Sequence, residues 1–355
     1  MIRWALILLV LCGPAFAQGS GEQRAEAAGQ SLIGSPAPRM VLKTIDGQAI
    51  DLGRLYGKKA VYLKFWATWC VPCREQMPHF EKTFEARGSD LEVIAINAGF
   101  NDSVEDVRAY RKRLGIKMPI VIDDGTLGTA LNLRVTPQHV VIGRDGRIEY
   151  VGHLANEQLE AALVAARKVP AGDGSGSGGS ADGGASVGGG KVAGGGSAGG
   201  SDAAKGAKHG VGDPAPAFSV TAMDGTQFGN KGPVVLVFLS PWCEAYLQTS
   251  RAADSARCRD VREQVESLAK QHPDVRWLGV ASGLWSSQDE LRQYAAKYKV
   301  TIPLTMDASA KLFNAFHVRS VPTVIAINGN GRIERRIEAN APALTAELER
   351  VALVR

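Results

Sequence analysis

The sequence is poor in several features that would settle its class at once. Only five cysteines and six histidines occur in 355 residues, and aromatic residues make up 6%. No run of lysine and arginine is interleaved with aromatics, which argues against a nucleic-acid partner. Behind the N-terminus, no apolar stretch approaches the roughly 20 residues that cross a bilayer. A formal net charge of +5 and 22% charged residues are ordinary for soluble globular protein. Composition by itself therefore names no function.

The first residues are typical of a cleavable export signal at residues 1–17. The stretch MIRWALILLVLCGPAFAQGS has one early basic residue, a short apolar run and small residues at Ala15 and Ala17. Cleavage there predicts a soluble periplasmic protein, whereas an uncleaved membrane anchor is the alternative. Cleavage also removes Cys12 and leaves four cysteines, Cys70, Cys73, Cys243 and Cys258. In an oxidising compartment we expect these to be disulfides or redox groups.

A Gly/Ser-rich segment at residues 170–210 divides the rest of the chain. It includes GDGSGSGGSADGGASVGGG and has almost no large side chain to bury, which predicts a flexible linker. One domain is then expected over 31–169 and a second over 211–355. A Gly/Ser coil of about 40 residues spans roughly 35 Å root mean square, enough for the two domains to meet.

The two parts look like diverged copies of one fold. GSPAPRMVLKTIDGQ from Gly34 is echoed by GDPAPAFSVTAMDGT from Gly212, and NLRVTPQHVVIGRDGRIE from Asn132 aligns without gaps with HVRSVPTVIAINGNGRIE from His317. A repeat of this kind indicates duplication. The cysteine and the proline stand further apart in the second copy, which places about a dozen extra residues around LQTSRAADSARCRD.

Within each copy, strand patterns alternate with helical ones. Apolar runs such as AVYLKFWA and LEVIAIN are followed by helical patterns such as SVEDVRAYRKRLG. The copy closes with a hairpin across GRDG in HVVIGRDGRIEYVG and a last helix in EQLEAALVAARK. This order predicts an α/β protein built from two three-layer sandwiches.

Cys70 and Cys73 carry the clearest chemistry. They lie in FWATWCVPC, just after a buried strand and at a predicted helix start, where free backbone N–H groups and the helix dipole favour a thiolate. We expect Cys70 to face solvent and attack a disulfide, and Cys73 to resolve the mixed disulfide. Pro72 restricts the turn between them, and Trp69 covers one side of the sulfur.

A zinc site and a purely structural bridge are the alternatives for this pair. Zinc normally takes four ligands, and no second closely spaced cysteine pair or His-x-x-His group accompanies the first. A bridge across so short a loop removes little chain entropy. We therefore expect no metal and no cofactor.

The segments FWATWCVPCREQMP and VTPQHVVIGRDGRI resemble periplasmic thioredoxin-like proteins of the TlpA/ResA type, over nearly all of residues 32–169. The resemblance implies a thioredoxin fold, reversible dithiol–disulfide exchange and a cis proline facing the active site. Pro137, preceded by Thr136, stands at that position, and the backbone beside it would pair with an extended substrate segment. An ordinary trans proline is the alternative.

The resemblance also implies partners. Exported protein disulfides would be the substrates, with haem-attachment cysteines of apocytochromes c or copper-site cysteines of oxidases as examples. A reductase in an oxidising compartment needs recharging, for which a membrane electron donor of the DsbD/CcdA kind is expected.

Two residues depart from the family. Lys64 stands on the strand below the site, where relatives carry a buried acid or asparagine, and a cation there would favour the Cys70 thiolate. The alternative is that its stem follows the sheet and its ammonium reaches water. Phe100 replaces a glutamate that helps proton transfer in some relatives, which leaves the proton acceptor open.

The second copy lacks an adjacent resolving thiol. Its positions that correspond to the first site hold Trp242, Cys243, Tyr246, Val237, Val321 and Pro322. Cys258, in the extra segment, is the candidate partner for a disulfide with Cys243; two free thiols are the alternative.

Several roles for this copy stay open. It is a docking or accessory domain, a thiol peroxidase suggested by the hydroxyl residue in SPWC, or a copper site made by Cys243, Cys258 and His317. A metal- or protein-binding module without enzymatic activity is the alternative for the whole chain. Cys243 could also exchange with Cys70 inside one molecule, because the tether raises its effective concentration.

Overall fold

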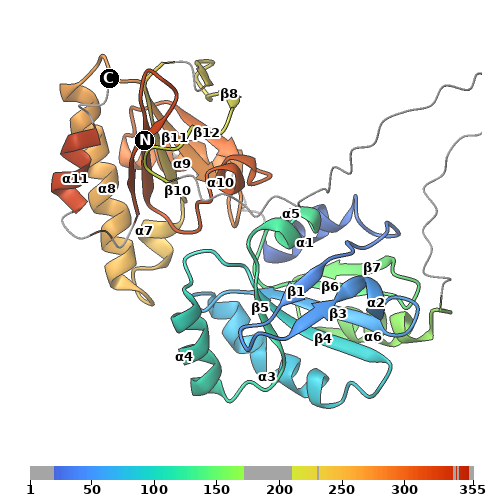
Figure 1. Ribbon diagram of the computed structural model, residues 1–355. Helices are drawn as coiled ribbons and strands as arrows, with labels where there is room; N and C mark the ends of the chain where they lie inside the picture. Colours follow the sequence, from blue (N-terminus) through green and yellow to red (C-terminus); the bar gives the residue numbers. More distant parts are fainter. Residues whose placement is uncertain (1–19, 172–209, 230–231, 339–340, 342–343, 352–355) are drawn as a thin grey trace, which may run out of the picture.

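The computed structural model describes residues 20–171, 210–229, 232–338, 341 and 344–351, arranged as two α/β units. Figure 1 shows the two units side by side, with the first in blue to green and the second in yellow to red. The expected export signal at residues 1–17 and nearly all of the expected linker at 170–210 lie outside the described residues. Among the described residues, no helix combines the length and apolar character that a membrane crossing requires.

A mixed sheet of five strands forms the centre of the first domain. Its strand order is β5-β4-β3-β6-β7, with β3, β4 and β5 parallel and β6 and β7 antiparallel to their neighbours. The strands are β3 (Ala60–Trp66), β4 (Leu91–Asn97), β5 (Ile120–Ile122), β6 (Gln138–Ile142) and β7 (Ile148–Gly152). Every residue of β3 is buried, as expected of a central strand covered on both faces. The expected hairpin across GRDG is the one that joins β6 to β7.

Helices cover both faces of this sheet. Those of the first domain are α1 (Gly21–Gly29), α2 (Leu52–Leu55), α3 (Val71–Glu85), α4 (Val104–Leu114), α5 (Thr126–Ala130) and α6 (Glu157–Lys168), and a small hairpin joins β1 (Val41–Lys43) to β2 (Ala49–Asp51). Tyr62 and Trp66 of β3 pack with α3, α4 and α6, whereas Leu63 and Phe65 face α2 and α5. The three predicted layers are therefore present.

Helix α1 precedes residue 31, where the sequence places the start of the first domain. Ser20 and Gln23 form a reciprocal capping box at its N-terminus. Ala25 and Ala28 are buried, and a Cβ on Gly29 would lie 2.9 Å from the Val151 Cβ of β7. Small residues on one face of α1 thus let the helix lie directly on the edge strand, so the described fold extends ahead of residue 31.

The second domain repeats this sheet. Its strand order is β12-β11-β10-β13-β14, with the same parallel and antiparallel pairings. The strands are β10 (Val234–Leu239), β11 (Trp277–Ser282), β12 (Leu304–Asp307), β13 (Thr323–Ile327) and β14 (Ile333–Ile337), with a small hairpin of β8 (Ser219–Thr221) and β9 (Gln227–Gly229). Both sheets therefore have the order and directions of one duplicated fold.

The extra residues of the second domain lie between β10 and β11. The first domain has the single helix α3 there, whereas the second has α7 (Cys243–Tyr246), a turn, and α8 (Ala252–Gln271). The remaining helices are α9 (Gln288–Tyr298), α10 (Lys311–Ala315) and α11 (Leu344–Val351). The extra segment thus lies where the sequence comparison places it, and it carries Cys258.

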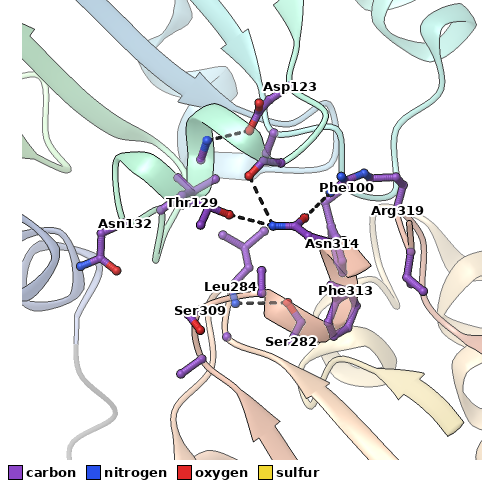
Figure 2. Close-up of a pocket in the computed structure, with 18 residues that line it drawn as sticks. Phe100, Asp123, Thr129, Asn132, Ser282, Leu284, Ser309, Phe313, Asn314 and Arg319 are labelled. Atoms are coloured by element: carbon purple, nitrogen blue, oxygen red, sulfur yellow. Dashed lines mark hydrogen bonds between the residues drawn. The ribbon is translucent and has the colours of Figure 1, made fainter. Parts of the chain in front are cut away.

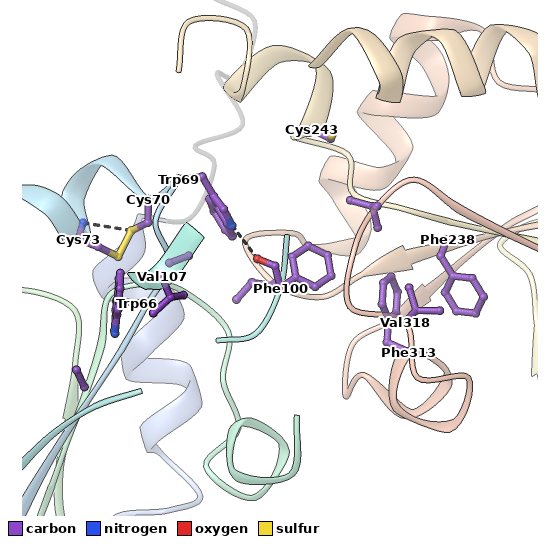
Figure 3. Packing of buried hydrophobic residues seen from close by; sticks show 14 of the residues in the cluster. Trp66, Trp69, Cys70, Cys73, Phe100, Val107, Phe238, Cys243, Phe313 and Val318 are labelled. Atoms are coloured by element: carbon purple, nitrogen blue, oxygen red, sulfur yellow. Dashed lines mark hydrogen bonds between the residues drawn. A yellow bond between two sulfur atoms is a disulfide. The ribbon is translucent and has the colours of Figure 1, made fainter. Parts of the chain in front are cut away.

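The buried cores of the two domains are continuous. Trp69 and Phe100 of the first domain belong to the same buried cluster as Phe313 of α10. The rings of Phe100 and Phe313 are 5.9 Å apart, and Figure 3 shows Phe100 between Trp69 and the second domain. The domains therefore meet through apolar side chains next to Trp69.

Candidate active site

Cys70 and Cys73 are disulfide-bonded at the N-terminus of α3. Their Cα atoms are 5.2 Å apart. Cys70 is the N-cap residue, and the Cys73 backbone N–H donates to its Sγ at 3.2 Å. Pro72 lies in the first turn, where the missing N–H of a proline leaves no helical bond unmade. A thiolate at Cys70 would meet this N–H and the positive end of the helix dipole.

The Thr136–Pro137 peptide is cis, which confirms the conformation implied by the resemblance. The Cys70 Sγ lies 3.2 Å from the Thr136 carbonyl oxygen. The cis bond therefore brings the backbone that precedes β6 directly against the sulfur. Thr136 and the cis Pro137 thus lie next to Cys70.

Two buried histidines near Pro137, His139 and His153, were not singled out by the sequence analysis. His153 Nδ1 and the Pro137 carbonyl oxygen are 2.7 Å apart, an arrangement in which Nδ1–H donates to that carbonyl. His139 Nδ1 lies 2.7 Å from the Tyr62 hydroxyl, and its Nε2 lies 2.9 Å from the Gln76 Oε1. Burial lowers the pKa of both histidines, well below the usual value for His139. Both rings are therefore neutral at pH 7, and His153 positions the proline carbonyl.

Lys64 is fully buried beneath the site. It lies on β3 directly opposite His139 of β6, and its Nζ is 5.2 Å from the centre of the Phe80 ring. Among the residues that the structure describes, none makes a hydrogen bond to this Nζ. The interpretation that the ammonium reaches water is therefore wrong. Burial lowers the pKa of Lys64 to about 7, so a substantial fraction of the side chain is neutral at that pH.

Asp102 organises the loop that precedes Cys70. Its carboxylate accepts hydrogen bonds from the Thr68 backbone N–H and hydroxyl, at 2.8 and 2.6 Å, and from Asn97 Nδ2 at 2.7 Å. Trp69 Nε1 donates to the Phe100 carbonyl oxygen at 2.8 Å. Burial raises the pKa of Asp102, against these hydrogen bonds, which lower it. Asp102 was missed because a single aspartate in a loop has no distinguishing sequence pattern.

Cys70 does not face solvent, contrary to expectation. It is 1% exposed, and Trp69 is 3% exposed. Side chains of the second domain contact the two residues that flank Cys70: Tyr246 accepts a hydrogen bond from the Val71 N–H, and the Trp242 ring stacks on Trp69. The second domain therefore packs against the start of α3.

The second domain contains its own disulfide, between Cys243 and Cys258. Their Cα atoms are 6.2 Å apart, and Tyr246 occupies the place of a resolving thiol. The Val321–Pro322 peptide is cis. The Cys258 Sγ lies 4.0 Å from the Val321 carbonyl oxygen, so Cys258 has the place next to the cis proline that Cys70 has in the first domain.

The copper alternative finds no support in the described part of the chain, where no group of three or more His, Cys, Asp or Glu side chains is arranged to hold a metal. Both cysteines of the proposed set are engaged in the disulfide. His317 has a positive φ of 51° and lies at the turn that follows α10.

A cavity of ≈ 90 Å³ lies between the domains, beside Phe100. Figure 2 shows Asn314 pointing from the second domain to Thr129 of the first, and its Nδ2 donates to the Thr129 hydroxyl at 2.8 Å. Arg319 Nη1 donates to the Asn314 Oδ1 at 3.0 Å. Burial lowers the pKa of Arg319, which is nevertheless charged at any ordinary pH. These polar contacts extend the interface beyond the aromatic residues.

Comparison with known proteins agrees with this geometry. Residues 33–151 match the AhpC/TSA family model, and residues 210–351 match the Redoxin model. Thiol-disulfide oxidoreductase ResA of Bacillus cereus is 34% identical over 166 residues, which cover 44% of this chain and 91% of that protein. Thioredoxin-like protein YneN of Bacillus subtilis is 35% identical over 133 residues, 37% of this chain and 78% of that protein.

Among solved structures, a thiol:disulfide interchange protein of the thioredoxin family from Chlorobium tepidum is 29% identical and has a TM-score of 0.32, covering 38% of this chain and 96% of that one. The AhpC/TSA match at residues 33–151 includes the Cys70–Cys73 disulfide. The chain therefore belongs to the ResA family of thiol-disulfide oxidoreductases, and it joins one such thioredoxin-like domain to a second, diverged one.

Proposed function

We propose that this enzyme reduces disulfides of exported proteins, with Cys70 as the attacking thiol and Cys73 as the resolving thiol. The observation that carries the proposal is the position of the Cys70 Sγ. It receives the Cys73 N–H at 3.2 Å and lies 3.2 Å from the carbonyl oxygen before the cis proline. The first contact favours a thiolate, and the second brings the sulfur to backbone that can align a substrate segment.

The exchange proceeds in two displacements. The Cys70 thiolate attacks one sulfur of the substrate disulfide; a mixed disulfide forms, and the other substrate sulfur leaves as a thiolate that takes a proton. The Cys73 thiolate then attacks the Cys70 Sγ, forming the Cys70–Cys73 disulfide and releasing the second substrate sulfur, which is protonated in turn. Two electrons pass from the enzyme dithiol to the substrate. A dithiol donor returns them.

The residues around the pair have distinct parts in this scheme. Thr136 and Pro137 offer backbone to the substrate, and Trp69 and Pro72 form the wall beside the sulfur. His153 acts as a positioning residue, because its hydrogen bond to the Pro137 carbonyl holds the backbone that faces Cys70. Lys64 tunes the couple: its protonated form favours the thiolate over the thiol, and its buried position makes that influence depend on pH near 7.

We infer the setting from the sequence features and from the family. The N-terminal segment at 1–17 has the pattern of a cleavable export signal, which favours the periplasm. Haem-attachment cysteines of apocytochromes c or copper-site cysteines of oxidases are suitable substrates, and a membrane protein of the DsbD/CcdA kind is a suitable electron donor. Both are proposals from the resemblance.

The reduction potential of the Cys70–Cys73 couple tests the direction of the reaction. A value near roughly −270 mV, as in thioredoxin, supports a reductase, and a value near roughly −120 mV makes the protein an oxidant and contradicts the proposal. Turnover of a model protein disulfide, lost in Cys70→Ser, tests the attacking role. Cys73→Ser should retain the first displacement and accumulate the mixed disulfide, which mass spectrometry identifies.

For the second domain we propose an accessory role in place of an independent dithiol cycle. Tyr246 replaces the adjacent resolving thiol, and the Cys243–Cys258 disulfide joins α7 to α8 instead. Cys73→Ser also tests the relay between domains. Trapping of a Cys70–Cys243 or Cys70–Cys258 linkage within one chain supports a relay, whereas adducts with other proteins alone contradict it.

A further inference from the structure

The two domains contact each other through equivalent backbone positions. The Asn101 N–H donates to the Arg319 carbonyl oxygen at 2.7 Å, and the Trp285 N–H donates to the Arg134 carbonyl oxygen at 2.9 Å. Asn101 lies just after β4, and Trp285 lies just after β11, the corresponding strand of the second domain. Their φ angles are 54° and 58°. Each acceptor arginine stands three positions before the cis proline of its own domain. The contact is therefore reciprocal, like an isologous dimer interface built within one chain.

The side chains of these donors repeat the pattern. The Asn101 Oδ1 accepts the Val321 N–H at 2.8 Å, and the Trp285 Nε1–H donates to the Thr136 hydroxyl at 3.1 Å. Val321 and Thr136 directly precede the two cis prolines. Each domain thus uses one loop to bind the segment that directly precedes the cis proline of the other.

Aromatic rings complete the centre of the interface. Trp69 and Trp242, the residues that precede Cys70 and Cys243, stack with ring centres 4.9 Å apart. The Trp285 ring lies 5.6 Å from His153, which holds the Pro137 carbonyl. Figure 3 shows Trp69 between the Cys70–Cys73 disulfide and the second domain. The surface that surrounds the redox sulfur is thus the surface that the second domain binds.

An ion pair anchors one edge of this contact. Arg251 of the second domain lies 3.0 Å from the Asp102 carboxylate, whose side chain is fully buried, and it also contacts the Thr68 hydroxyl. Its other guanidinium nitrogen donates to the Asn101 carbonyl oxygen at 2.7 Å. Asp102 also accepts the hydrogen bonds of Thr68, which precedes Trp69 and Cys70. Arg251 therefore links the second domain to the loop that positions the active site. A pair this well desolvated is costly to break on one side.

We propose that the second domain is the resident occupant of the substrate face of the first, so that a disulfide substrate reaches Cys70 only after the second domain has moved off. Trp285 binds Arg134 and Thr136, the backbone and side-chain groups that a substrate segment would meet beside Pro137. The inference rests on the proposed function, because only a disulfide reductase would bind its substrate at this face. The partner that fits the face is a thioredoxin-like domain of this same chain, presenting a tryptophan at a positive-φ turn.

The test compares the full chain with a variant that weakens the interface from the second domain only. Arg251→Glu sets a carboxylate against buried Asp102, and Arg259→Glu, an exposed charge reversal on α8, is the matched control. After full reduction, alkylation of Cys70 by iodoacetamide is followed at the peptide level. We expect Arg251→Glu to speed alkylation about tenfold or more, because the open fraction rises with the loss of interface free energy. Arg259→Glu should match the wild type.

A second measurement reports the interface without any thiol chemistry. The amides of Asn101 and Trp285 donate across the domains, so hydrogen exchange of these two amides should be slow in the wild type and faster in Arg251→Glu by the same factor. Trp285→Phe, which keeps an aromatic ring but is smaller and loses the hydrogen bond to Thr136, should give a smaller change in the same direction.

Two results would overturn the proposal. One is equal Cys70 alkylation and equal amide exchange in the wild type and Arg251→Glu; the other is amide protection that falls on dilution, which would assign the occupant to a second copy of the chain. Failure of the proposed function looks different. In that case the wild type and Arg251→Glu show the expected alkylation and exchange, yet neither reduces a protein disulfide.

Discussion

The two domains have the same sheet but carry different side chains at its centre. Lys64 of β3 pairs with His139 of β6 in the first domain, and the corresponding pair in the second is Val237 with Val324. The ionisable pair lies below the Cys70–Cys73 disulfide, and the aliphatic pair belongs to the domain without a second adjacent thiol. A buried ammonium that finds no hydrogen-bond partner in the described part of the chain does not stabilise a fold. The comparison indicates that the buried Lys64 and His139 serve the redox chemistry of the first domain and not its stability.

The largest expected effect is a difference in the rate of disulfide reduction between variants of the two cysteine pairs. Cys70→Ser should lower the rate of protein-disulfide reduction about a thousandfold or more, since the attacking thiol is lost and Cys73 alone cannot complete the two displacements. Cys243→Ser should leave most of the rate, because Tyr246 cannot resolve a mixed disulfide in the second domain. Steady-state reduction of a protein disulfide measures both. Equal losses in the two variants would contradict the division of roles.

The next effect concerns stability at the centre of the first sheet. The pKa of Lys64 is about 7 in the folded chain against 10.5 when unperturbed, a difference worth roughly 5 kcal/mol. Lys64→Met should therefore raise the free energy of unfolding of the first domain by about 2 to 5 kcal/mol at pH 7, with the lost contact to the Phe80 ring offsetting part of it. Denaturation followed by hydrogen exchange in β3 measures the change.

The sign of the pH dependence follows from the lowered pKa. Between pH 7 and 10.5 the unfolded chain binds more protons at Lys64 than the folded chain, so wild-type stability rises with pH across that window. The advantage of Lys64→Met should be complete at pH 7 and below and vanish near pH 10.5. Val237→Met, at the matching position, should show no such slope. The cation hypothesis further predicts that Lys64→Asn raises the Cys70 pKa, and an unchanged thiol titration would remove it.

A third effect is a difference in stabilisation between the two disulfides, which close loops of different length. Cys243 and Cys258 are separated by 15 positions and Cys70 and Cys73 by 3. Loss of the longer cross-link should destabilise the second domain by about 3 kcal/mol, from the chain entropy returned to the unfolded state. Reduction of the shorter one should cost the first domain about half as much. Thermal unfolding of Cys258→Ala beside Cys73→Ala measures the contrast, and equal losses would contradict it.

The smallest effect appears on acidification. Burial lowers the pKa values of His139 and His153 below the ordinary 6.5, so the unfolded chain binds extra protons below pH 6.5. The first domain should therefore lose stability as the pH falls through and below that value. The corresponding positions in the second domain hold Val324 and Glu338, so no histidine contributes there. Hydrogen exchange in β3 and β10 at pH 7.5 and 5, corrected for intrinsic rates, reports each domain.

Local pattern was enough to predict much of this molecule. The alternation of strands and helices, the hairpin across GRDG and the last helix of the first domain all follow from periodicity and turn chemistry. The resemblance implied the cis peptide at Pro137. Spacing between Cys243 and Pro322 located the extra residues that became α7 and α8. Each of these features is encoded by neighbouring residues or by a short motif.

Features that depend on distant contacts were not predictable. His153 matters because β7 brings its Nδ1 to the Pro137 carbonyl, and Asp102 because it meets Thr68 and Arg251. Strand alternation placed Lys64 on a face of the sheet, yet it could not decide whether the long side chain reaches water. The contacts that the second domain makes with Trp69 and Val71, on either side of Cys70, were missed for the same reason, since the whole linker separates the two domains in the sequence.

The stacked indoles of Trp69 and Trp242 should give a circular-dichroism signal that depends on contact between the two domains. Ring centres 4.9 Å apart with planes tilted by 28° place two strong transition dipoles close enough for excitonic coupling. Such coupling gives a paired positive and negative band in circular dichroism that vanishes when the chromophores separate. The distance between the two halves of the chain can thus be followed spectroscopically, without attaching any label, while substrate is added.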